Sequence, residues 1–127
     1  MIICIFGVRY RDDIDRDLHK KLNDDMAHAV AGMPGFISIK FYKAEDGDQI
    51  GIIRFQTRDD LKNWRDDIAH RGAWRYAPKL YHEFWVQNAE TFEDYVWIDG
   101  VHHDRDQTDR FQMTETDVLN ALATDRP

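Results

Sequence analysis

Residues 36–56 read FISIKFYKAEDGDQIGIIRFQ, and this pattern predicts two strands joined by a tight turn. Residues 36–43 and 49–56 are rich in β-branched and aromatic side chains, which are typical of strands. Between them, the pair Asp46-Gly47 is a strong hairpin signal, because glycine readily adopts the positive φ of such turns. The stretch is therefore expected to form an antiparallel hairpin.

An amphipathic helix is expected before this hairpin, within residues 12–32. Its apolar side chains recur every four residues and form one broad stripe, which comprises Ile14, Leu18, Leu22, Met26 and Val30. Acidic residues near its start favour the positive end of the helix dipole. Gly32 and the following Pro34-Gly35 supply the stop signals.

A second helix is expected after the hairpin. Thr57 is its candidate N-cap, and Asp60 lies three residues later, as in a capping box. The predicted buried face of this helix comprises Leu61, Trp64 and Ile68. Gly72 and Pro78 limit its length, so residues 69–79 are expected to be irregular or a short helical turn.

Two further strands are expected at residues 2–10 and 80–88, where apolar and aromatic side chains are again dense. The order over residues 1–88 is then β-α-β-β-α-β. This order predicts an α+β, ferredoxin-like fold, with one antiparallel sheet and both helices on one face. We expect this domain to occupy residues 1–90 and a C-terminal extension to follow over residues 91–127.

The second face of the predicted sheet also carries many apolar side chains. If the last strand alternates, its helix side comprises Leu80, Phe84 and Val86, and the side pointing away comprises Tyr81, Glu83, Trp85 and Gln87. Residues 2–10 are apolar on both sides as well. A single chain would expose this patch, and a second copy is the simplest cover. We therefore predict a homodimer whose two sheets pack face to face around a mixed aromatic and polar cavity.

The C-terminal extension is expected to pack on the core or on the partner subunit, because it is too apolar for a free tail. Its first part contains a compact cluster formed by Phe92, Tyr95, Val96, Trp97 and Ile98. Thr114, followed by Asp117, is expected to cap a last short helix. The final few residues are expected to be frayed.

Charge and composition exclude several classes of function. The formal net charge is −7, from 24 acidic against 17 basic residues with no basic block, so no nucleic-acid partner is expected. Cys4 is the only cysteine, which excludes an intrachain disulfide and favours a reducing compartment. The apolar N-terminal run lacks the features of a signal peptide, and no stretch reaches the ~20 apolar residues of a membrane span. We therefore expect a soluble, cytoplasmic protein.

Sequence motifs for nucleotide, flavin and zinc-hydrolase chemistry are absent, which fits either a cofactor-free pocket or no catalysis. His102 and His103, with Asp104 and Asp106, could suggest a metal site. Adjacent histidines rarely converge on one ion, and no third ligand set stands at a suitable spacing. We therefore interpret this group as a solvated loop and expect neither a cofactor nor a metal.

Three stretches of the chain resemble the antibiotic biosynthesis monooxygenase superfamily of dimeric α/β barrels. They are residues 33–38 (MPGFIS), Trp64-Arg65 with His70-Arg71, and residues 80–86 (LYHEFWV). The resemblance covers roughly residues 1–90 and implies cofactor-independent oxygenation of phenolic or quinol-type aromatics, although the superfamily also includes haem-degrading enzymes. Residues 2–10 lack the asparagine typical of haem degraders, and His70 lies closer to Trp64 than their axial histidine does. Both departures argue against haem degradation.

The resemblance implies a site in the barrel cavity, with Trp64 and His70 as catalytic candidates and Arg54, Tyr81 and Trp85 as substrate-binding candidates. Each has a structural alternative. Trp64 suits a helix core, and His70 suits a helix C-terminus, where a cation is favoured. Arg54 faces either the cavity or solvent, while Tyr81 and Trp85, which share a face if their strand alternates, suit a dimer interface equally well. In one continuous helix Trp64 and His70 lie about 120° apart, so both reach one cavity only if the helix breaks between them.

Three functions are compatible with these candidates. The first is oxygenation of a small electron-rich aromatic molecule, which itself supplies the electrons as a phenolate. Trp64, Arg54 and Tyr81 would orient the substrate and stabilise its anion, and His70 would remove the proton. The second is a dimer that binds haem or another apolar metabolite without turnover. The third is a structural dimer whose cavity is filled by its own side chains.

Overall fold

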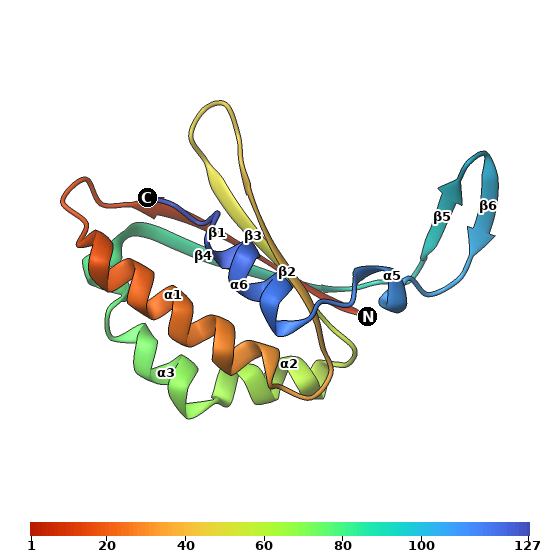
Figure 1. Ribbon diagram of the computed structural model, residues 1–127, viewed down its shortest axis with the longest axis horizontal. Helices are drawn as coiled ribbons and strands as arrows, with labels where there is room; N and C mark the ends of the chain where they lie inside the picture. Colours follow the sequence, from red (N-terminus) through yellow and green to blue (C-terminus); the bar gives the residue numbers. More distant parts are fainter.

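A computed structural model describes all 127 residues and shows one antiparallel sheet with helices on one face (Figure 1). The sheet has four strands in the order β2-β3-β1-β4. Their bounds are Ile2–Tyr10 for β1, Phe36–Lys43 for β2, Gln49–Phe55 for β3 and Tyr81–Glu90 for β4. The predicted α+β, ferredoxin-like arrangement is confirmed.

Four helical segments follow the sequence signals between these strands. They are α1 (Arg16–Ala31), α2 (Arg58–Asp66), α3 (Ile68–Trp74) and α4 (Ala77–Leu80). The Asp15 side chain accepts the backbone N–H of Leu18, so α1 begins later than predicted. The capping box of Thr57 and Asp60 is present at the start of α2, as predicted. Residues 69–79 are more regular than expected, since α3 and most of α4 lie within them.

The inner row of α1 differs from the predicted stripe. Val30 is buried, but Leu18, Leu22 and Met26 are only half-buried. The fully buried side chains of this helix are those of His19, Ala27 and Val30. A strict spacing of four residues advances about 40° per step around a helix of 3.6 residues per turn, so the stripe drifts away from the sheet.

The core lies between the sheet and the helices. Its largest fully buried side chains belong to Phe55, Ile37, Val30 and Val118. Val118 comes from the C-terminal extension, in helix α6 (Glu115–Leu122). This helix packs against α1 and β2 and therefore contributes to the same core as residues 1–90.

The C-terminal extension runs around the β2 edge of the sheet. Strands β5 (Tyr95–Ile98) and β6 (Val101–Asp104) form a hairpin that projects beyond the sheet (Figure 1). After α5 (Thr108–Phe111), the backbone N–H of Met113 donates to the carbonyl of Ile37 at 2.8 Å. The chain then enters α6, which begins with the predicted capping box of Thr114 and Asp117.

Two expectations about the extension are wrong. His102 and His103 lie in strand β6 rather than in a solvated loop, because they pair across the hairpin with Trp97 and Val96. The final residues are not all frayed, since Asp125 is only 7% exposed. None of the helices combines the length and apolar character needed to cross a membrane.

Candidate functional site

A break between α2 and α3 brings Trp64 and His70 together. Asp67 leaves the helical conformation, with φ −59° and ψ 135°. Its carboxylate accepts the backbone N–H groups of Ala69 at 3.1 Å and His70 at 3.2 Å, and so begins α3 in a new direction. The rings of Trp64 and His70 stack with centroids 4.1 Å apart and planes 11° apart. The helix therefore breaks between Trp64 and His70, as these two residues require if both are to reach one site.

The hydrogen bonds of His70 define which ring nitrogen is protonated. Nδ1 lies 3.1 Å from the backbone carbonyl oxygen of Trp64. Because a carbonyl only accepts, Nδ1 carries the proton and Nε2 keeps its lone pair. Nε2 has no hydrogen-bond partner in the chain and is not buried, since no buried side-chain nitrogen is left without a partner. His70 therefore presents a free basic nitrogen to solvent.

The surroundings of His70 keep its imidazole neutral. Burial lowers the pKa of His70 below 6.5, and the Trp64 carbonyl and the Asp67 charge oppose this shift only in part. His70 lies in the first turn of α3, at the positive end of the helix. The expectation that it sits at a helix C-terminus is therefore wrong, because α2 ends before it rather than after it.

Trp64 belongs to the core and also reaches its edge. The side chain is 5% exposed and packs within the buried cluster that includes Leu61. Its indole N–H has no acceptor in the chain and is not buried, since no buried side-chain nitrogen is left without a partner. The pair thus offers one unpaired donor, on Trp64, and one unpaired acceptor, on His70.

The helix layer leaves part of the sheet uncovered beside β4. Phe84 and Val86 pair with Val8 and Phe6, whose side chains face the helices. Nevertheless Phe84 and Val86 are 49% and 48% exposed. Across the sheet the helices follow the order α6, α1, α3, so α3 lies toward β4 (Figure 1). An aromatic surface on β4 is consequently open on the side of the molecule that carries His70.

Tyr81 lies on this surface, contrary to the expectation that it shares a face with Trp85. Arg9 pairs with Glu83, but Tyr10 pairs with Tyr81, so one extra residue bulges out of β4. The bulge turns Tyr81 to the helix side, where its ring lies 5.4 Å from that of Tyr10. Burial raises the pKa of Tyr81 above its ordinary value.

Trp85 and Arg54 lie on the opposite face of the sheet. We call this surface the open face; it includes Ile3, Ile5 and Gly7 of β1 with their cross-strand neighbours. The Trp85 side chain covers Gly7, because a Cβ added at Gly7 would clash with the indole ring. The guanidinium of Arg54 stacks 4.1 Å from the ring of Phe111, and burial lowers its pKa. One chain therefore does not gather all the predicted site residues into one cavity.

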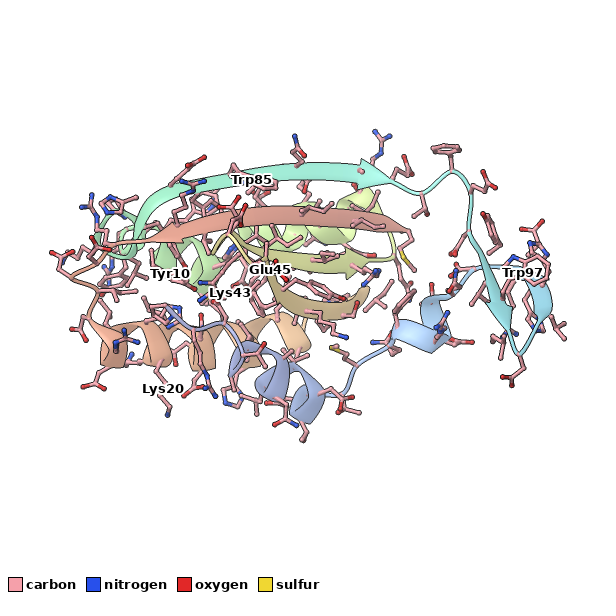
Figure 2. The ribbon with its side chains drawn as sticks, turned by 90° about the horizontal axis from the view of Figure 1, so that it is seen from above. Tyr10, Lys20, Lys43, Glu45, Trp85 and Trp97 are labelled. Atoms are coloured by element: carbon pink, nitrogen blue, oxygen red, sulfur yellow. The ribbon has the colours of Figure 1, made fainter.

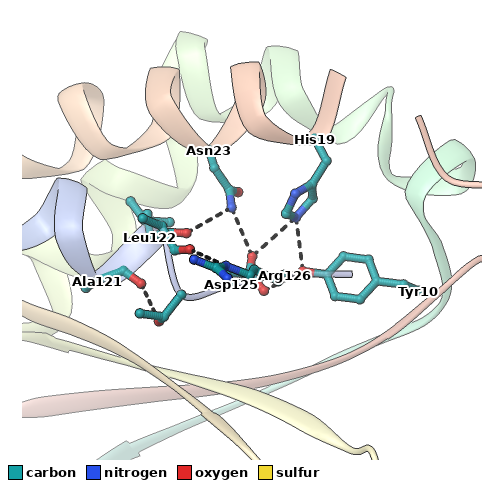
Figure 3. Close-up of polar contacts among 9 residues, drawn as sticks. Tyr10, His19, Asn23, Ala121, Leu122, Asp125 and Arg126 are labelled. Atoms are coloured by element: carbon teal, nitrogen blue, oxygen red, sulfur yellow. Dashed lines mark hydrogen bonds and ion pairs between the residues drawn. The ribbon is translucent and has the colours of Figure 1, made fainter. Parts of the chain in front are cut away.

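A buried polar network on the helix side was not predicted (Figure 3). The Asp125 carboxylate accepts the Tyr10 hydroxyl and, at 3.2 Å, the side-chain amide of Asn23. His19 Nε2 lies 3.0 Å from the Tyr10 hydroxyl and 3.5 Å from Asp125. Burial, followed by the Asp125 charge, raises the pKa of Tyr10. The only sequence signal for this network is that His19 and Asn23 lie four residues apart, and therefore on the same side of α1.

A hollow of about 480 Å³ lies elsewhere, at the end of the sheet where β1 meets the β2–β3 turn. Its charged lining includes Arg9, which is paired with Asp48 at 3.0 Å. It contains none of the predicted site residues. We therefore place the candidate site at His70, where unpaired polar atoms meet aromatic side chains. No group of three or more histidine, cysteine or acidic side chains could hold a metal ion.

Comparisons with known proteins support the fold. No family model matches the chain, and no curated protein matches it. Among solved structures, SnoaB, a cofactor-independent oxygenase from Streptomyces nogalater (N63A mutant), has a TM-score of 0.61 at 9% identity, covering 73% of this chain and 94% of its own. A proposed antibiotic biosynthesis monooxygenase from Nitrosomonas europaea has a TM-score of 0.59 at 12% identity, covering 72% of this chain and 99% of its own.

A third solved structure bears on assembly. A dimeric ferredoxin-like protein of unknown function from Thermobifida fusca has a TM-score of 0.56 at 17% identity, covering 72% of this chain and 92% of its own. At these identities the likeness shows a common fold. The chain thus has the fold of dimeric ferredoxin-like proteins and of antibiotic biosynthesis monooxygenases, as the three sequence stretches indicated.

Proposed function

We propose that the protein is a cofactor-independent monooxygenase that acts on a small phenolic or quinol-type aromatic. The observation that carries this proposal is the stacked Trp64–His70 pair, with Nδ1–H of His70 held by a backbone carbonyl and Nε2 free. A neutral imidazole that is oriented through one nitrogen is suited to accept a proton through the other. The oxygenase fold of SnoaB supports the reaction class.

His70 would start the reaction by removing a proton from the substrate. The resulting phenolate or carbanion is electron-rich enough to reduce O2 without a flavin or metal. In the conversion of an anthrone-type CH2 to a carbonyl, one oxygen atom enters the product and the other leaves as water. The substrate supplies all four electrons, and the proton on His70 is returned to the reduced oxygen. The indole N–H of Trp64 is a donor that can stabilise the developing oxyanion.

The aromatic surface beside α3 supplies the binding energy in this proposal. Tyr81 and Phe84 have ring centroids 5.5 Å apart, and Phe84 stacks on Phe6 at 5.7 Å. Trp74 contacts His70 edge-on at 5.5 Å and is 48% exposed. Flat apolar rings with few polar groups suit a planar aromatic substrate.

We further propose that the protein works as a homodimer whose open faces pack together. Ile3, Ile5, Ile50 and Ile52 lie half-exposed on that face, and Trp85 is 40% exposed. Covering such a surface is favourable, at about 25 cal/mol per Å² of apolar area. Arg54 and Trp85 would then belong to the dimer interface, not to the site at His70.

Binding of haem or another apolar molecule without turnover is the second candidate function. The free Nε2 of His70 favours it, because this is the atom by which histidine ligates haem iron. The aromatic surface beside it would equally suit a porphyrin or a phenol.

One experiment separates these functions. Metal-stripped protein is given a panel of phenols, anthrones and quinols, and O2 consumption is measured. We expect turnover that His70→Ala abolishes and that Trp64→Phe reduces without unfolding the protein. His28→Ala is the matched control, because His28 is exposed and pairs with Glu115 on the far side of α1 from α3.

Haem titration of the same proteins tests the second function. A Soret shift that is lost in His70→Ala, together with no turnover of any substrate, would replace the oxygenase by a haem-binding protein. Neither turnover nor saturable binding would leave only the structural dimer.

A further inference from the structure

The β5–β6 hairpin has no cover within its own chain. Trp97 is 64% exposed, Val101 55%, and Phe92, just before the hairpin, 98%. Trp97 pairs with His102, while Val101 pairs with Ile98, so apolar residues occupy both faces of the hairpin. Figure 2 shows Trp97 beyond the end of the four-stranded sheet, away from α1 and α6. Exposed apolar residues on both sides of a projecting element indicate a protein partner.

The hairpin is held in place at its base. The backbone N–H of Gln107 donates to Asp94 at 3.1 Å, and its side-chain amide donates to the carbonyl of Tyr95 at 2.7 Å. Four residues after Gln107, the ring of Phe111 stacks on the Arg54 guanidinium of the open face. The hairpin is therefore an ordered element that rises from the margin of the open face.

Charge complements this apolar character. Residues 92–106 contain a single base, Arg105, against five acids, which are Glu93, Asp94, Asp99, Asp104 and Asp106. The open face presents three cations, Arg9, Lys40 and Arg54, and one acid, Glu83. Arg9 pairs with Asp48 and Glu83, whereas Lys40 and Arg54 form no ion pair within the chain. In a chain with a net charge of −7, the excess of basic side chains on this face favours contact with an acidic element.

We propose that the β5–β6 hairpin is an arm that a second copy of this chain receives on its open face. The arm then lies over the Lys40 and Arg54 side of the partner's open face, beside the area where the two open faces pack together. By symmetry each copy gives one arm and receives one. This inference rests on the homodimer of the proposed function and adds the element that holds it together.

The test is dimer affinity measured by sedimentation over a range of protein concentrations. We expect Trp97→Asp with Val101→Asp to weaken dimerisation at least about tenfold, because two buried apolar contacts are lost. Both side chains are exposed in the single chain, so the subunit should keep its fold, which circular dichroism checks. Ile68→Asp, at a residue 88% exposed on α3, is the matched control and should dimerise like the wild type. Lys40→Glu tests the receiving surface and should weaken the dimer as well.

The outcomes distinguish the arm from the dimer. A wild-type chain that is monomeric at micromolar concentration would overturn both the homodimer and the arm. A wild-type dimer whose affinity is unchanged by Trp97→Asp with Val101→Asp would overturn the arm alone. An unchanged affinity in Lys40→Glu would overturn its placement on the open face.

Discussion

Asp125→Ala tests whether the polar network of Figure 3 holds the end of the chain on the domain. The carboxylate is buried and accepts hydrogen bonds from the Tyr10 hydroxyl and from Asn23. A hydrogen bond to a charged group contributes about 1.5–3 kcal/mol. Both donors are partly exposed, so when the carboxylate is removed they can hydrogen-bond to water, which recovers part of this free energy. We expect the free energy of unfolding to fall by about 2–4 kcal/mol.

Urea unfolding followed by circular dichroism measures this loss. The midpoint should fall while the slope with denaturant stays constant, because the folded surface barely changes. Tyr10→Phe alone should cost about 1–2 kcal/mol, and the double variant should cost less than the sum of the two. Asp24→Ala is the control, since Asp24 is exposed and pairs only with Lys20 one turn away, a pair that contributes about 0.5 kcal/mol or less.

Two results would refute the network. One is a loss below about 0.5 kcal/mol for Asp125→Ala, the size expected of an exposed acid. The other is full additivity of Asp125→Ala and Tyr10→Phe, which would show that the two residues do not interact.

Three further predictions concern single positions. The imidazole of His70 should titrate below pH 6.5 by NMR. In Asp67→Asn its pKa should be lower still, because this variant keeps the helix cap but removes the charge that raises the pKa. Activity that needs the neutral imidazole should be lost as pH falls. Gly7→Ala should displace Trp85, which near-ultraviolet circular dichroism detects, at a cost of about 1–3 kcal/mol. Because the pKa of Tyr10 is raised above 10.0, the unfolded chain releases this proton first, so stability should fall as pH rises above about 10, and less steeply in Tyr10→Phe.

The parts of the fold that the sequence predicted are those with local determinants. The Asp46-Gly47 turn and the capping boxes at Thr57 and Thr114 each need only a few neighbouring residues. Strands and helices follow from such signals together with the hydrophobic period, so the β-α-β-β-α-β order could be predicted from one sequence. Their failures were small and concerned where a helix begins or which row of it is buried.

The site was harder to predict because its geometry depends on irregularities. The bulge in β4 turns Tyr81 to the helix side, and no residue type near it marks an extra residue. The polar network joins residues that are far apart in the sequence, since Tyr10 and Asp125 are separated by 115 positions. The break at Asp67 was more accessible, because an aspartate that can cap a following helix is a recognisable signal.

The C-terminal extension explains why the candidate site lies beside β4 rather than at the centre of the helix layer. Helix α6 packs on β2 and α1, and the Asp125 network secures the chain beyond it. The β2 side of the helix face is thereby filled with the chain's own side chains. Because α1 occupies the middle, the most exposed aromatic side chain of the sheet on this face is Phe84, on the β4 side. The break at Asp67 and the bulge in β4 then bring His70 and Tyr81 to that same side, which is where the proposed aromatic substrate would bind.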